Sequence, residues 1–73
     1  MNMDAIDALL SRDVPNSPDA AEWMRGVRDA AAVVRARPDA CRRELERMSR
    51  EDSWYAQGVE AVISALWESG AWR

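Results

Sequence analysis

Few residues of this chain have side chains that could carry out chemistry. It contains no histidine and no lysine, all ten of its basic residues are arginine, and Cys41 is its single cysteine. A general base that titrates near neutral pH is therefore missing, and a thiolate at Cys41 would lack the imidazole that normally activates it. Glu44 and Glu46 do not share a helix face, which indicates solvated charges instead of a metal site. Glycines stand only at positions 26, 58 and 70, so there is no glycine-rich phosphate-binding loop. We expect no enzyme, no cofactor and no metal.

Residues suited to protein contact are abundant by comparison, because four of the 73 residues are tryptophan. Tryptophan is enriched among the residues that dominate binding energies. Trp23 lies at the edge of a well-defined apolar stripe and is expected in the core. Trp54 and Trp67 lie on opposite flanks of the stripe of the last expected helix, so periodicity does not allow both to be central core residues. Trp72 follows the expected helix end at Gly70, and it either folds back over the bundle or serves as a contact anchor.

Charge is distributed in blocks that the net value of −3 conceals. Residues 1–24 carry five acids and one arginine, residues 25–50 carry eight arginines and four acids, and residues 51–73 carry four acids and one arginine. Such a segmented surface can steer a charged partner and make its association rate depend on salt. The same charges can instead pair within the chain, and both interpretations use the same residues.

Two sets of arginines illustrate these interpretations. Arg28 and Arg35 border the apolar stripe of the second expected helix, where they could pair with acids of the first and last helices. Such surface pairs contribute only about 0–1 kcal/mol each. Arg43, Arg47 and Arg50 recur at helical spacing opposite a thin apolar side, which predicts a charged row that is either solvated or in contact with a partner.

Proline, glycine and capping residues mark the expected elements. A short amphipathic helix is predicted over residues 3–10, followed by a loop over 11–17. Ser17 is a good N-cap and Pro18 fits the first helical position, so a second helix is predicted over 18–37.

Pro38 ends or kinks this second helix, because its ring disfavours helical geometry at the preceding residue and it cannot donate a hydrogen bond. A third helix is predicted over 39–48, and one kinked helix over 18–48 remains an alternative. The apolar side of this third helix is thin and consists of Cys41, Leu45 and Met48.

The last helix is predicted over residues 50–69. Ser49, with Asp52 three residues later, suggests a capping box at its start, and Gly70 suggests its end. Residues 70–73 are then a short tail.

These elements predict an all-α fold, a single domain over residues 1–73 built as a small bundle of three or four helices with the last helix the longest. Two apolar stripes at helical spacing define the expected core. The second helix contributes Ala20, Trp23, Met24, Val27, Ala31 and Val34, and the last contributes Tyr55, Val59, Val62 and Leu66.

The sequence also indicates where the protein resides. No apolar stretch approaches the roughly 18 residues that would span a bilayer. The acidic N-terminus is unlike a signal peptide, and a lone cysteine fits a reducing compartment. We therefore expect a cytoplasmic protein without a membrane partner.

These observations favour a protein-binding module that modulates, and specifically inhibits, a larger bacterial macromolecular machine. Its expected contact residues are Trp54, Trp67, Trp72, Arg43, Arg47 and Arg50. In size, acidity and tryptophan content the chain resembles phage-encoded inhibitors of host machinery, such as anti-CRISPR proteins and RNA polymerase modulators. This resemblance carries no residue pattern across, and it implies a larger enzyme complex as the partner.

Two other functions remain open. The helices on either side of Pro38 could bind nucleic acid like a helix-turn-helix, with arginines 42, 43, 47 and 50 following phosphates. Against this, the net charge is acidic, the turn has no glycine and the third helix has no Asn or Gln to read bases. The other alternative is an antitoxin-like homo-oligomer, in which case a homodimer is expected.

Overall fold

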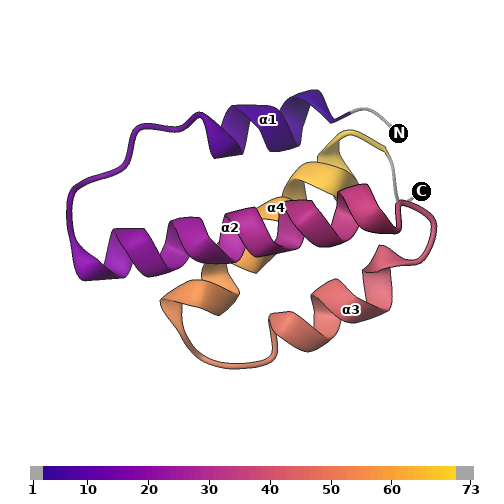
Figure 1. Cartoon of the computed structure of the whole chain (residues 1–73). Helices are drawn as coiled ribbons and strands as arrows, with labels where there is room; N and C mark the ends of the chain where they lie inside the picture. Colours follow the sequence, from indigo (N-terminus) through magenta and orange to yellow (C-terminus); the bar gives the residue numbers. More distant parts are fainter. Residues whose placement is uncertain (1–2, 71–73) are drawn as a thin grey trace.

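Four α-helices make up the fold, as shown by a computed structural model that describes residues 3–70. In chain order these are α1 (Asp4–Leu10), α2 (Pro18–Ala36), α3 (Cys41–Met48) and α4 (Trp54–Glu68). No strand occurs between residues 3 and 70, so the predicted all-α bundle is confirmed. In Figure 1, α2 runs through the middle, with α1 along one side of it, α3 along the other, and α4 passing behind it.

The limits of α2 follow the sequence signals. The hydroxyl of Ser17 accepts a hydrogen bond from the backbone N–H of Ala20 at 3.2 Å, and Pro18 is the first helical residue. At the other end Arg37 leaves the helical region, with φ −142° and ψ 71°, as expected for a residue before proline. A turn closed by the hydrogen bond from Ala40 N–H to Arg37 C=O then leads into α3. Pro38 therefore separates two helices and does not kink a single one.

The predicted start of the last helix is wrong by four residues. Ser49 is the C-cap of α3, where its hydroxyl donates a hydrogen bond to the Glu46 carbonyl at 3.1 Å. The N-cap of α4 is Ser53, whose hydroxyl accepts from Ala56 N–H at 3.1 Å. The capping box suggested for Ser49 and Asp52 does not form, since that motif depends on the longer Glu or Gln side chain reaching back to the cap. As a result α4 has 15 residues, and α2, with 19, is the longest helix instead of the last one.

The core lies between α2 and α4, which form the most extensive helix pair. Both predicted stripes are largely confirmed: their central residues are buried, whereas Ala20, Trp23 and Tyr55 are half-buried at the edges. The other helices contribute Ile6, Cys41 and Leu45 to the same core. Its fully buried large side chains are Ile6, Leu45, Leu66, Val27, Val34, Val59, Val62 and Cys41.

The two long helices touch through their backbones at a pair of glycines. A Cβ atom added at Gly26 would lie 2.1 Å from the Tyr55 carbonyl oxygen, and one added at Gly58 would lie 2.0 Å from the Trp23 carbonyl oxygen. Neither distance leaves room for a methyl group, so only glycine permits this approach. Each glycine instead directs a Cα hydrogen toward a carbonyl of the other helix, a contact that recurs at helix–helix interfaces.

This crossing has a sequence signal that periodicity did not reveal. Both helices carry the pattern aromatic-x-x-Gly-Val, as Trp23 to Val27 in α2 and as Tyr55 to Val59 in α4. The repeated pattern places corresponding turns of the two helices against each other.

Polar contacts join the outer helices to this pair. Arg35 on α2 pairs with Asp7 on α1 at 3.0 Å, which confirms the predicted ion pair with the first helix. Both side chains are more than half exposed, so the pair contributes at most about 1 kcal/mol. No ion pair involving Arg28 occurs among the described residues. Burial of Ile6 therefore holds α1 in place more than its charges do.

Candidate protein-binding surface

Two tryptophans on α4 are the large apolar side chains most exposed in the described part of the chain. Trp54 keeps 45% of its surface accessible and Trp67 keeps 43%. They are thirteen positions apart, which separates them by about 20 Å along the helix axis and places them on opposite flanks. They belong to two different surfaces of the molecule.

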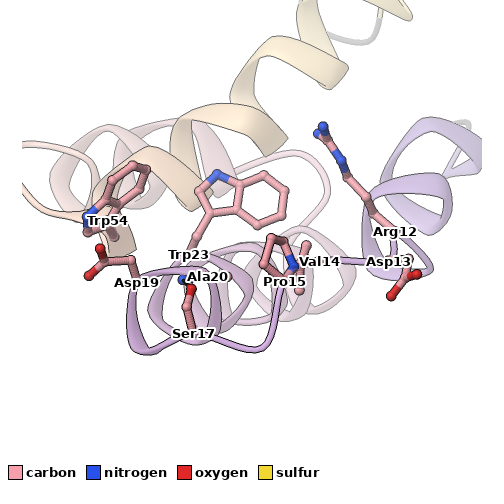
Figure 2. A pocket seen from close by; sticks show the side chains of 9 residues that line it. All are labelled: Arg12, Asp13, Val14, Pro15, Ser17, Asp19, Ala20, Trp23 and Trp54. Atoms are coloured by element: carbon pink, nitrogen blue, oxygen red, sulfur yellow. Dashed lines mark hydrogen bonds between the residues drawn. The ribbon is translucent and has the colours of Figure 1, made fainter.

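Trp54 borders an open groove where α2 and α4 both begin (Figure 2). The groove has a volume of about 460 Å³ and is closed on one side by the loop that joins α1 to α2. It is lined by Arg12, Asp13, Val14, Pro15, Ser17, Asp19, Ala20, Trp23 and Trp54. The Ser17 and Ser53 caps fix the two helix starts, and thereby the positions of the two indoles, Trp23 and Trp54.

The groove combines aromatic faces with charges of both signs. The guanidinium carbon of Arg12 lies 5.6 Å from the centre of the Trp23 ring, within the range of a cation–π contact. In Figure 2, Trp54 and Asp19 lie at one end, Trp23 lies in the middle, and Arg12 and Asp13 lie at the other end. Trp23 packs against the core with part of its ring and lines the groove with the rest. The sequence predicts only the core role of Trp23.

Trp67 belongs to the second surface, beside α3. The guanidinium carbon of Arg42 lies 5.2 Å from the centre of the Trp67 ring, and Arg42 also pairs with Glu46 at 3.2 Å. Next to them is a hollow of about 510 Å³ formed by Ala40, Arg42, Arg43 and Glu46. Trp67 is thus presented beside a polar, charged surface and not within an apolar cleft.

The predicted row of Arg43, Arg47 and Arg50 does not form one continuous surface, because the three residues differ in their position and contacts. Arg47 donates from Nε to Glu44 at 3.1 Å and makes a second hydrogen bond from Nη2 to the other carboxylate oxygen. These hydrogen bonds hold the pKa of Glu44 below its usual value and raise the pKa of Arg47. Arg43 lies on α3, whereas Arg50 lies beyond the last helical residue, Met48. The three side chains therefore do not continue along one helix face. Trp72, the remaining predicted contact residue, lies outside the described residues.

Tyr55 links the two long helices next to the groove-lining Trp54. Its hydroxyl donates a hydrogen bond to the Asp29 carboxylate at 2.5 Å. Burial, with a further contribution from that carboxylate, raises the pKa of Tyr55 to about 12. This hydrogen bond therefore joins α4 directly to α2.

The described residues contain neither a cluster that could hold a metal ion nor a helix that could cross a membrane. No three cysteine or carboxylate side chains come close enough together to hold a metal ion. None of the helices in residues 3–70 combines the length and the apolar character that crossing a membrane requires.

Comparison with known proteins adds no relative to this description. The chain matches no known protein family, and no curated protein and no solved structure shows significant similarity to it.

Proposed function

We propose that the protein is a small cytoplasmic module that binds a larger bacterial macromolecular machine and inhibits it by occupying part of its surface. One observation carries the proposal: Trp54 and Trp67 remain close to half exposed on a helix whose other large apolar residues are buried or half-buried. Burying an exposed indole against a partner removes a large apolar area from water, which is why tryptophan is frequent at binding hot spots.

The charge on these surfaces supports a protein partner over nucleic acid. On α3, Arg42 and Arg47 are paired with glutamates of the same helix, so part of the basic charge that phosphates would require is already compensated. Nucleic-acid binding is therefore the weaker proposal, and it predicts a mobility shift of duplex or single-stranded DNA at low salt.

The experiment is capture of partners from a lysate of the host bacterium by the tagged protein, followed by mass spectrometry. Alanine at both Trp54 and Trp67 is expected to remove the captured complex, since the loss of one hot-spot residue alone costs about 2 kcal/mol or more, or roughly thirtyfold in affinity. Glu60→Ala is the matched control, because Glu60 is exposed on the same helix and lines none of the hollows described above. Equal capture by the double variant, with its helical content intact, would rule the proposal out.

A further inference from the structure

The Trp54 end of the groove has the composition of a site for a cation. Aromatic faces and carboxylates together recognise guanidinium and ammonium groups, through cation–π attraction and charge-assisted hydrogen bonds. Trp54 offers an exposed ring, and the carboxylate of Asp19 lies at the same end of the groove. The side-chain carboxylates of Asp13 and Asp19 form no ion pair or hydrogen bond with the residues that the structure describes.

The protein itself shows which cation suits an indole in this groove. Arg12 places its guanidinium over the Trp23 ring at 5.6 Å, so an arginine already occupies one of the two aromatic faces. The second indole, Trp54, lies beyond Trp23 at the opposite end from Arg12 (Figure 2). Arg12 is the single basic residue among those that line the groove. A second guanidinium can therefore be supplied only from outside this groove.

The dipoles of α2 and α4 oppose the binding of a cation at this end of the groove, so their charge must be compared with that of the nearby carboxylates. Both α2 and α4 begin at the groove, and a helix N-terminus carries about half an elementary positive charge. Ser17 and Ser53 each satisfy one of the free N–H groups at these ends. Full negative charges surround the same ends, with Asp19 in the first turn of α2 and the exposed Glu51 and Asp52 just before α4. The carboxylates outweigh the dipoles, and the Trp54 end remains favourable to a cation.

We propose that this groove binds an exposed arginine side chain of the partner protein, with its guanidinium stacked on Trp54 and hydrogen-bonded to the carboxylate of Asp19. The proposal rests on the protein-binding function above and names the chemistry that the partner must present. Arginine fits better than lysine because its planar group can stack on an indole and contact a carboxylate with two N–H groups at once. The groove is also large enough for a side chain, since ligand sites begin at about 300 Å³.

The test uses the purified protein and a short acetylated peptide, Gly-Ser-Arg-Ser-Gly amide, observed through the indole N–H signals in NMR spectra. We expect the Trp54 and Trp23 signals to shift with a dissociation constant of about 1 mM, as one stacked and hydrogen-bonded guanidinium provides. The same peptide with citrulline, which keeps the shape but lacks the charge, is expected to bind at least tenfold more weakly. Equal shifts with both peptides would overturn the proposal, and so would the absence of any shift with the arginine peptide.

Variants make the assignment specific. Asp19→Asn introduces a residue that is tolerated in the first helical turn. It is expected to lower the affinity for the arginine peptide about tenfold, because it removes a charge-assisted hydrogen bond. Trp54→Ala is expected to abolish the shift at Trp23. Glu60→Gln, which neutralises an exposed acid elsewhere on α4, is expected to leave binding unchanged. Unaltered binding by Asp19→Asn contradicts the proposed contact even if Trp54→Ala proves too unstable to test.

The two proposals can fail separately. If lysate capture depends on Trp54 but the arginine peptide does not bind, the protein-binding function stands and the arginine site is wrong. If the peptide binds but no partner is captured, the chemistry of the groove stands and the function is wrong.

Discussion

At the scale of single residues, exposure distinguishes Trp54 and Trp67 from the side chains of the core. Val27, Val59 and Val62 are completely buried, whereas Trp54 and Trp67 each keep nearly half of their surface in water. An exposed indole gives up the transfer free energy that burial would provide, roughly 25 cal/mol for each square ångström. Exposed indoles of this kind are common at binding sites, and their exposed surface adds nothing to the stability of the isolated chain.

Tyr55 supplies a prediction at the same scale, concerning pH. Its pKa is raised to about 12 in the folded protein, compared with about 10 for an unperturbed tyrosine. The folded state therefore holds this proton more tightly, and the associated stability is fully present below pH 10 and lost as the pH rises through 12. The free energy of unfolding is expected to fall less steeply over this range in Tyr55→Phe than in the original protein. Urea denaturation at several pH values measures both slopes, and identical slopes would contradict the role assigned to the hydroxyl.

At the scale of elements, the approach of α2 to α4 depends on two missing side chains. Alanine in place of glycine normally stabilises an exposed helix by about 1 kcal/mol. At Gly58 the sign is expected to reverse, because the added methyl group would meet the backbone carbonyl of Trp23 at 2.0 Å. We expect Gly58→Ala to destabilise the fold by about 1–3 kcal/mol or more, as overpacking does.

Thermal unfolding followed by circular dichroism measures this effect. Gln57→Ala is the matched control, since Gln57 precedes Gly58 on the exposed side of the same helix. The control is expected to change the melting temperature little. A stabilised Gly58→Ala variant would show that the helices do not meet as described.

The elements also show how far sequence reasoning extends. Ser17, Pro18, Pro38 and Gly70 were sufficient to predict both ends of α2 and the end of α4, because caps and breakers act locally. The predicted start of α4 is wrong because Ser49 and Ser53 both resemble helix N-caps, and the short Asp52 side chain does not complete a capping box with Ser49. The groove could not be predicted at all, since Trp23 and Trp54 share it only through the crossing of their helices. Periodicity reports which face of a helix is buried, but it does not report which turn of another helix covers that face.

At the scale of the whole molecule, the described residues form one core to which all four helices contribute. The two exposed indoles are about 20 Å apart along α4 and do not form the continuous apolar patch that obligate dimers bury. The charge blocks also contact each other within the chain, because Arg35 in the basic block pairs with Asp7 in the acidic N-terminal block. Part of the segmented charge is therefore paired within the molecule.

A monomer is the expected state in solution. Light scattering should give a mass near the 8.2 kDa of one chain, and the melting temperature should not change over a tenfold range of concentration. A melting temperature that rises with concentration would instead favour the homo-oligomeric alternative.

The glycine contact has a consequence for selectivity. Gly26 lies three positions from Trp23, and Gly58 lies four positions from Trp54, so about one helical turn joins each glycine to an indole of the groove. The distance between the two rings therefore depends on how closely the backbones of α2 and α4 approach each other at the two glycines. This crossing is buried and makes no contact with a ligand in the groove. Substitutions at Gly26 or Gly58 that move the two backbones apart should change which ligands fit between Trp23 and Trp54, although no residue that lines the groove is replaced.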